Sequence, residues 1–333
     1  MNYRHAFHAG GISDVLKHMA LVELLRLVTV KDKPILMMDT HAGAGAYDLA
    51  GAAAMRSGEA SRGVLRVLAA SNSPPAVRRY VDAVWRFDRY CGNRGPGLLH
   101  YPGSPRLMKA AARAGDRIVL CEAEAGAVQA LRREFAGDRR VEVRAEDGFA
   151  VLRAVLPPAQ RRALVLIDPP YERAAEWTVA AQAAKDALRR LPTATLMLWH
   201  PLKGDGAAAA LLTTLAGYAV PKTLSVRLTL GPSQVMARPG RRPPLQGCGL
   251  VLINPPWGFE ASMREALPWL AQTAVGDGCA SEMEWLVAER PAPLRQPGPA
   301  ARAGPRPASH HPSKPPAAMP SKAPSGMKAK KTR

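Results

Sequence analysis

The stretch Ala163-Leu164-Val165-Leu166-Ile167-Asp168-Pro169-Pro170-Tyr171 decides the fold of this chain. Its five apolar residues follow Arg161 and Arg162, and they have the character of a parallel strand buried on both faces. The strand ends at a carboxylate, and two prolines prevent its continuation. Ligands of open α/β sheets bind beyond the carboxyl ends of strands, so we expect Asp168 to Tyr171 to form the rim of a site.

The residue types of this rim suit a flat group that carries an amine. The Asp168 carboxylate and a backbone carbonyl can accept the two amine hydrogens, and the Tyr171 ring can stack on a planar base. The tetrapeptide is similar to the D/N-P-P-Y signature of amino-group methyltransferases that use S-adenosylmethionine (AdoMet). Four residues are a moderately specific pattern, so an ordinary Pro-Pro turn after a strand stays open as an alternative.

Helices and strands alternate around this stretch, as they do in an α/β sheet. Strands are expected at 34–40, 117–122, 141–145, 163–167, 194–200, 222–230 and 249–253. The strand 163–167 is then the fourth, which lies beside the first at the switch point of a doubly wound sheet. We therefore expect a Rossmann-like class I methyltransferase fold, with a mixed seven-stranded sheet flanked by helices.

A glycine-containing loop follows the first strand, with the sequence His41-Ala-Gly43-Ala-Gly45. Glycines allow a sharp turn and a close approach of the backbone to a ligand. Asp39 completes the pattern D-x-x-x-G-x-G, which is similar to the AdoMet loop of methyltransferases. Asp48 occupies the place of the third glycine of the dinucleotide fingerprint G-x-G-x-x-G, which argues against a nicotinamide cofactor.

Acidic residues end the next two strands. Glu122, at the end of the second, can hold the hydroxyls of a ribose, although Glu124 is a rival two residues later. Asp147 and Gly148 follow the third strand, where a carboxylate can meet the amine of an adenine. These positions would line one edge of the sheet together with Asp168.

The N-terminal region is expected to contain a helix from Asp14 to about Val28, with Ser13 as its N-cap. Spacing alone favours solvent-facing positions for Lys17 and His18. Residues 47–100 are expected to form a basic helical insertion near the mouth of the site, with amphipathic helices at 62–68 and 75–87. A pair of scaffold helices with solvated arginines stays open as an alternative.

Two further features follow from turn residues. Ser104 is expected to cap a helix that has Pro105 at its first position. Asn254-Pro255-Pro256-Trp257 is a second near-match to the signature. It follows a strand that should pair antiparallel and end at the opposite edge, so we assign it a structural role.

The charge of the chain favours a polyanionic partner. Lys and Arg number 46 against 27 Asp and Glu among 333 residues, a net charge of +19. Residues 290–333 contain ten Lys or Arg, eleven prolines and no acidic residue. Such a segment cannot bury a core, so it is expected to be disordered. It either holds RNA nonspecifically or is an inert extension, and residues 1–289 are expected to form the methyltransferase domain.

The remaining composition limits the class of protein. No apolar run is long enough to span a membrane, and the first residues lack the apolar centre of a signal peptide. The scattered cysteines argue against a zinc site or disulfide framework and fit a reducing cytoplasm; they are Cys91, Cys121, Cys248 and Cys279.

Seven segments together resemble the ribosomal large-subunit methyltransferase J family over about residues 2–288: Tyr3-Arg-His-x-Phe-His-Ala-Gly10, Asp14-Val-Leu-Lys-His18, Asp39-Thr-His-Ala-Gly-Ala-Gly45, Tyr101-Pro-Gly-Ser104, Glu146-Asp147-Gly148, Ile167-Asp-Pro-Pro-Tyr171 and Ile253-Asn-Pro-Pro-Trp257. The resemblance implies transfer of a methyl group from AdoMet to N6 of one adenine in 23S rRNA. We expect a cytoplasmic monomer that acts on free or partly assembled large-subunit RNA, with no membrane and no metal.

The resemblance assigns roles to individual residues. Asp168 is implied to be the catalytic acceptor, and Pro169 would supply the carbonyl that accepts the second N6 hydrogen. Tyr3 is implied to contact the substrate adenosine, on whose base Tyr171 is expected to stack. The positions implied to hold AdoMet are Lys17, His18, His41, Gly43, Gly45, Ser104, Glu122, Asp147, Gly148 and Asp168.

Other functions stay open on the sequence. The same signature serves enzymes that methylate DNA adenine or protein glutamine, although the basic charge disfavours a protein substrate. A nucleotide-binding oxidoreductase and a noncatalytic RNA-binding protein with a nucleotide pocket are the alternatives from other classes.

Overall fold

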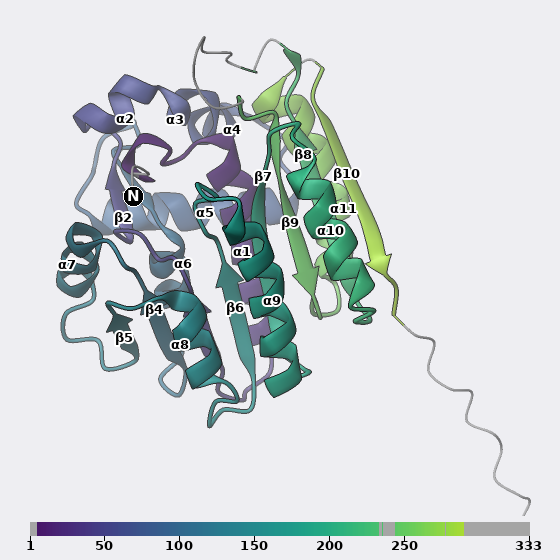
Figure 1. The fold of residues 1–333 in the computed structure, drawn as a ribbon. Coiled ribbons are helices and arrows are strands. Elements are labelled where there is room, and N and C mark those ends of the chain that lie inside the picture. The colour runs from purple at the N-terminus through teal and green to yellow at the C-terminus, as the bar shows by residue number, and fades with distance from the viewer. Residues whose placement is uncertain (1–4, 233–234, 236–243, 277, 290–333) are drawn as a thin grey trace, which may run out of the picture. The chain divides into compact units, whose positions relative to one another are not determined.

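The computed structural model describes residues 5–232, 235, 244–276 and 278–289. These residues form an eight-stranded mixed sheet with helices on both faces (Figure 1), and its strand order is β10-β8-β9-β7-β6-β1-β4-β5. The expected tail 290–333 and Tyr3 lie outside the described residues. Within the described part of the chain, no helix combines the length and apolar character needed to cross a membrane.

The strands of the main sheet are β1 (Leu36–Asp39), β4 (Arg117–Cys121), β5 (Val141–Arg144), β6 (Ala163–Ile167), β7 (Thr195–Leu202), β8 (Thr223–Thr229), β9 (Gly247–Ile253) and β10 (Ala280–Val287). A separate antiparallel pair consists of β2 (Ala46–Asp48) and β3 (His100–Pro102).

The helices are α1 (Ile12–Thr29), α2 (Ala52–Ser57), α3 (Glu59–Arg62), α4 (Val64–Ala69), α5 (Pro75–Tyr90), α6 (Ser104–Ala111), α7 (Ala125–Glu134), α8 (Gly148–Val155), α9 (Ala175–Arg190), α10 (Ala207–Gly217) and α11 (Phe259–Leu270). Two short helical segments are η1 (His5–Phe7) and η3 (Ala271–Val275).

The expected position of the fourth main strand is confirmed. β6 pairs in parallel with β1 on one side and with β7 on the other. All five residues of β6 are buried, which explains its uninterrupted apolar sequence. Because the parallel strands β4, β1, β6 and β7 point the same way, their carboxyl ends meet at one edge of the sheet.

The expected number of seven strands was wrong, because β10 adds an eighth. β10 pairs antiparallel with β8 at the edge of the sheet. Its sequence Ala-Ser-Glu-Met-Glu-Trp-Leu-Val alternates polar and apolar residues, and none of them is fully buried. An edge strand with one face in water gives a weaker hydrophobic signal than a central strand, so the sequence did not predict this strand.

Two hydrophobic clusters cover the two faces of the sheet. One contains residues of α1, α5, α6 and α11, and the other contains residues of α8, α9 and α10. Successive β1 residues separate accordingly, since Met37 belongs to the first cluster and Leu36 and Met38 to the second.

Residues 47–100 contain four helices, as the expected helical insertion requires, and α5 packs against α1. The buried Glu23 carboxylate of α1 pairs with Arg79 of α5 and accepts a hydrogen bond from Ser262 of α11 at 2.7 Å. The expected helix 62–68 is interrupted at Gly63, where an added Cβ would lie 2.3 Å from the Gly10 carbonyl oxygen. The backbone of α3 and α4 therefore packs directly on the segment before α1.

Candidate active site

Asp168 stands at the carboxyl end of β6, between the ends of β1 and β7. Its side chain is 14% exposed, and its Oδ2 accepts a hydrogen bond from Lys17 Nζ at 2.6 Å. Among the described residues, no hydrogen bond to Oδ1 is found. Pro169 is buried behind Asp168, so the Pro-Pro turn holds this carboxylate at the sheet edge.

Lys17 joins this carboxylate to a second one on its own helix. Its Nζ lies 3.0 Å from Asp14 Oδ1, and Asp14 Oδ2 lies 2.9 Å from His5 Nε2. Burial opposes the charge of Asp14, but His5 and Lys17 hold the pKa of this carboxyl well below its ordinary value. Lys17 therefore connects Asp14, which also contacts His5 of the N-terminal segment, to the Asp168 carboxylate at the rim.

The expectation of solvent-facing Lys17 and His18 was wrong, since only 4% and 1% of their surfaces are exposed. α1 lies between the sheet and the insertion, so its polar residues are covered from both sides. His18 Nδ1 is hydrogen-bonded to the Tyr101 hydroxyl at 2.9 Å, and the Tyr101 hydroxyl is in turn hydrogen-bonded to the Tyr80 hydroxyl. Burial lowers the pKa of His18 to about 3, so His18 is neutral near pH 7.

Ser13 is not the N-cap of α1, because the helix begins at Ile12, two residues before the expected start, and Gly11 takes the N-cap position. Gly10 N donates to Asp14 Oδ2 at 3.1 Å, so Asp14 is the side chain that anchors the backbone before the helix. Asp14 thus does more than begin the expected helix. The i, i+3 spacing of Asp14 and Lys17 is the signal that could have revealed the pair.

The glycine loop turns between β1 and the end of β4. Gly43 has φ +61° and Gly45 has φ +80°, a left-handed region that favours glycine. Gly43 N donates to Glu122 Oε2 at 2.8 Å, while Glu122 Oε1 accepts from the next two backbone N–H groups. Glu124 instead caps α7, accepting from the N–H groups of Gly126 and Ala127. Glu122 is thus the carboxylate that faces the loop.

Asp39 lies beneath this loop. Its Oδ1 accepts from His41 N at 3.1 Å and its Oδ2 from Ser104 Oγ at 2.6 Å. Burial, together with the nearby Asp168 charge, raises the pKa of Asp39 to about 6. Ser104 is the first residue of α6 and Gly103 is its N-cap, so the expected capping role of Ser104 was wrong. The Ser104 hydroxyl instead donates its hydrogen bond to the buried Asp39 carboxylate.

His41 and the turn between β5 and α8 lie at the same edge of the sheet as Asp168 and Glu122. Burial lowers the pKa of His41, while the carboxylates of Asp168, Glu122 and Asp147 act on it in the opposite sense. Asp147 caps α8 by accepting from Phe149 N at 2.9 Å. An added Cβ on Gly148 would lie 2.0 Å from the Thr40 carbonyl oxygen, so only glycine lets this turn approach the end of β1.

Tyr171 is buried, with 3% of its surface exposed. Its hydroxyl donates to the Trp199 carbonyl oxygen at 2.9 Å, and its ring centroid lies 4.2 Å from that of Trp177. The residue has φ +49°. In this conformation the ring packs against α9 and β7, so stacking on a base stays a prediction that requires the ring to turn outward.

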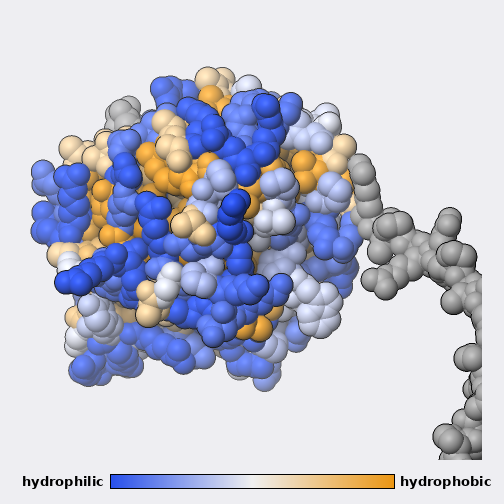
Figure 2. Space-filling view, turned by 90° about the horizontal axis from the view of Figure 1, so that it is seen from below, coloured by the Kyte–Doolittle hydropathy of each residue, from blue (hydrophilic) through white to orange (hydrophobic). Residues whose placement is uncertain are grey.

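The second signature lies at the other edge, as expected. β9 runs antiparallel to β7, so Asn254 follows its end at the edge opposite Asp168. Asn254 Nδ2 donates to the Pro192 and Ala194 carbonyl oxygens at 2.8 and 2.9 Å, which closes the turn before β7. Trp257 is 96% exposed. Figure 2 looks from below Figure 1, towards this opposite edge, and hydrophilic side chains cover much of the surface seen there.

The structure therefore gathers Lys17, Asp168, the glycine loop, Glu122 and the Asp147 turn at one sheet edge. Carboxylates at the ends of neighbouring strands can bind a ribose and an adenine amine, which fits AdoMet. Across the described residues, no group of three or more His, Cys, Asp or Glu side chains is arranged to hold a metal ion.

Comparison with known proteins agrees with this arrangement. Residues 32–287 match the family described as ribosomal RNA large subunit methyltransferase D, RlmJ. The chain is 35% identical over 290 residues to the ribosomal RNA large subunit methyltransferase J of Escherichia coli (strain K12), covering 87% of this chain and 100% of that protein. The enzyme of the same name from Haemophilus influenzae is 33% identical over 290 residues with the same coverage.

A solved structure is also similar. The crystal structure of a protein from Legionella pneumophila matches with a TM-score of 0.74 and 30% identity, covering 83% of this chain and 98% of that chain. This chain belongs to the ribosomal RNA large subunit methyltransferase J family.

Proposed function

We propose that this chain transfers a methyl group from AdoMet to N6 of one adenine in 23S rRNA, and that it does so in the cytoplasm on free or partly assembled RNA. The observation that carries the proposal is the position of Asp168-Pro-Pro-Tyr171. It ends β6 beside the glycine loop of β1, in a chain that belongs to this family. A carboxylate and a fixed turn at this place suit an amine that receives a methyl group.

AdoMet would lie across the ends of β1, β4 and β5. The Glu122 carboxylate has about four lone-pair sites and three backbone donors, so it retains one for a ribose hydroxyl. Asp147 is exposed and would accept from the adenine amine of the cofactor. Gly43, Gly45, His41 and Ser104 shape the loop that carries it. When bound, AdoMet supplies an electrophilic methyl group on its sulfonium.

Asp168 would act on the amine through Oδ1, because Lys17 already holds Oδ2. Oδ1 and the Pro169 carbonyl oxygen would accept the two N6 hydrogens. This draws the nitrogen lone pair out of conjugation with the ring and stabilises the positive charge that develops during transfer. The amine must be held about 3 to 3.5 Å from the methyl carbon for in-line attack, which a fixed turn achieves better than a mobile loop. The released proton would go to Asp168 or to water.

Lys17 would orient the catalytic carboxylate. A lysine 2.6 Å from Oδ2 restricts rotation of the Asp168 side chain and directs Oδ1 towards the substrate. Asp14, on the other side of Lys17, offsets the repulsion between this ammonium and the sulfonium of AdoMet. His18 would act near the cofactor through Tyr101, because its own ring is buried.

The target adenine would have to leave its stack, since a base inside folded RNA cannot reach a sheet-edge site. Tyr3 would close over the base from the N-terminal segment. Tyr171 would contact the base after its ring turns outward from Trp177.

The decisive experiment compares 23S rRNA from cells with and without the gene, mapping N6-methyladenine by mass spectrometry of RNA fragments. One modified adenine should disappear without the gene and return with the wild-type gene. Purified protein with labelled AdoMet should then modify the same adenine in the unmodified RNA. An unchanged modification map would refute the proposal. Labelling of DNA or protein instead of RNA would show that the chain methylates a different class of substrate.

A further inference from the structure

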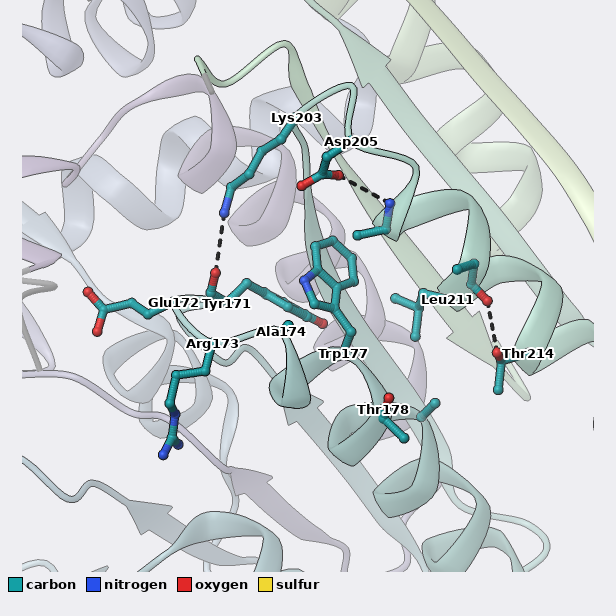
Figure 3. Close-up of a pocket in the computed structure, with 13 residues that line it drawn as sticks. Tyr171, Glu172, Arg173, Ala174, Trp177, Thr178, Lys203, Asp205, Leu211 and Thr214 are labelled. Carbon is teal, nitrogen blue, oxygen red and sulfur yellow. Dashed lines mark hydrogen bonds between the residues drawn. The ribbon is translucent and has the colours of Figure 1, made fainter. Parts of the chain in front are cut away.

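A cavity of about 390 Å³ lies directly beyond the Asp168 rim, between the first turns of α9 and α10. Figure 3 shows Trp177 between Tyr171 on one side and Leu211 on the other, with Lys203 and Asp205 above it. Arg173, at the same mouth, points away from the Trp177 ring. The roles proposed above for the methyl transfer leave this cavity unassigned.

The cavity lies on the far side of Asp168 from the residues assigned to AdoMet. Those residues follow β1, β4 and β5, whereas Lys203 and Asp205 follow β7, and β6 separates the two groups in the sheet. A molecule in this cavity would therefore sit next to the amine held by Asp168 without displacing the cofactor.

The walls combine a flat aromatic surface with polar groups at the rim. Trp177 offers an indole, and Leu211 and Ala181 add apolar surface. Lys203 Nζ donates to the Tyr171 carbonyl oxygen at 3.3 Å, which ties the end of β7 to the Asp168 rim. Asp205 Oδ1 accepts from Ala207 N at 3.1 Å, so it is held at the start of α10.

The charges of the lining decide what kind of group fits. Lys203 and Arg173 are matched by Asp205 and Glu172, so the cavity has no excess of positive charge. A bare phosphate would be repelled by two carboxylates. A flat heterocycle with both donors and acceptors suits an indole surface bordered by an ammonium and carboxylates. The volume lies within the range of about 300 to 1,000 Å³ that is typical of small-ligand sites.

We propose that this cavity holds the base of the nucleotide adjacent to the target adenine in the RNA strand. The inference rests on the proposed function and adds a subsite to it. Single-stranded RNA is recognised by splaying its bases onto aromatic side chains, and Trp177 is placed for this a few residues beyond Asp168. Lys203 contacts the rim itself, so occupancy of the cavity would also steady the turn that holds the reacting amine.

The test uses RNA fragments that contain the target adenine, either intact or with an abasic residue at the 5′ or the 3′ neighbour. The value of kcat/KM is measured for the wild-type protein and for three variants. Trp177→Ala removes the stacking surface. Ala210→Tyr fills the cavity from the exposed face of α10. Ala209→Tyr is the matched control, because the neighbouring Ala209 is equally exposed but lines a different cavity.

The wild-type protein should lose about tenfold in kcat/KM on one of the two abasic RNAs, as expected when one base–aromatic stack is lost. Trp177→Ala and Ala210→Tyr should show this loss of kcat/KM already with intact RNA. The abasic residue should not lower the kcat/KM of these two variants any further. Ala209→Tyr should behave as the wild type does. AdoMet affinity should be unchanged in all four proteins.

Two outcomes would overturn the subsite. One is an equal abasic penalty in all four proteins, and the other is no penalty in the wild type. Either leaves the proposed methyl transfer intact. If the wild-type protein methylates none of the RNAs, the proposed function itself fails and the subsite falls with it. Because Ala210→Tyr changes an exposed helix residue, it decides the question even if Trp177→Ala is unfolded.

Discussion

At the scale of single residues, the site depends on which groups contact Asp168. Lys17 and Asp168 are separated by 151 positions in the sequence, yet they form one hydrogen bond of 2.6 Å. Asp39 lies near the same carboxylate with a raised pKa, and Asp14 lies beyond Lys17 with a lowered one. Three carboxylates around one ammonium make the charge state of this cluster sensitive to any single substitution.

Asp168→Ala is expected to lower kcat by about 100- to 1,000-fold, the range found when a group that stabilises developing charge is removed. AdoMet affinity should stay within a few fold, because the proposed cofactor contacts follow β1, β4 and β5. Single-turnover transfer and equilibrium AdoMet binding measure the two effects. Unchanged turnover would remove Asp168 from the catalytic role.

Lys17→Met is expected to reduce the free energy of unfolding by about 3 to 5 kcal/mol, because it leaves two buried carboxylates without their shared cation. Asp14 and Asp168 are 3% and 14% exposed, so water compensates little. Urea denaturation provides the measurement, with Lys17→Arg as the variant that keeps the charge. A loss below about 1 kcal/mol, the usual value of an exposed pair, would show that the cluster is effectively solvated.

The pH dependence of stability should show the contribution of the buried, neutral His18 ring. Its folded pKa of about 3 lies below the ordinary value of 6.5, so between these values the unfolded chain binds a proton that the folded chain does not. Stability is therefore fully present above about pH 6.5 and falls as the pH drops. The extra slope is about 1.4 kcal/mol per pH unit at most. Denaturation of the wild type and His18→Gln from pH 7 to 4 should differ by this slope, and parallel curves would contradict it.

At the scale of elements, strand direction separates the two Pro-Pro signatures. β6 is parallel to β1 and ends at the site, whereas β9 is antiparallel to β7 and ends at the opposite edge. The same residue pattern thus lies at the proposed catalytic site at one edge and closes a turn at the other. Asn254 has φ +53°, a conformation that asparagine tolerates better than most residues, and this explains its presence there.

Asn254→Ala should accordingly cost stability and spare catalysis. It removes two hydrogen bonds to the turn before β7, worth about 1 to 3 kcal/mol together. Methyl transfer by the folded variant should stay within a few fold of the wild type. A catalytic loss as deep as that of Asp168→Ala would mean that the wrong Pro-Pro strand was assigned to the site.

At the scale of the whole molecule, the charge distribution concerns RNA affinity. The ten basic and no acidic residues of 290–333 would release counterions from RNA if they contact phosphates. A chain ending at residue 289 should then bind RNA more weakly, with a smaller slope of log affinity against log salt concentration. Filter binding over a range of salt concentrations measures this slope. Equal slopes for the two chains would make the segment an inert extension.

Local patterns in the sequence determined much of this protein. Five consecutive apolar residues before Asp168 predicted a buried parallel strand, and β6 confirms it. The order of the acidic and glycine-containing strand ends predicted that β6 lies beside β1. These features follow from short-range rules of burial, turn chemistry and strand order, which act within a few residues. The family resemblance rests on the same short segments.

Tertiary structure alone decided how the side chains are used. It buried Lys17 and His18, which spacing had placed in solvent, because the insertion covers the outer face of α1. It assigned Glu124 to a helix cap and left Glu122 facing the glycine loop. It also packed Tyr171 against Trp177 beside a cavity. The physical reason is common to these cases: burial and pairing depend on partners many residues away, and a local pattern carries no information about them.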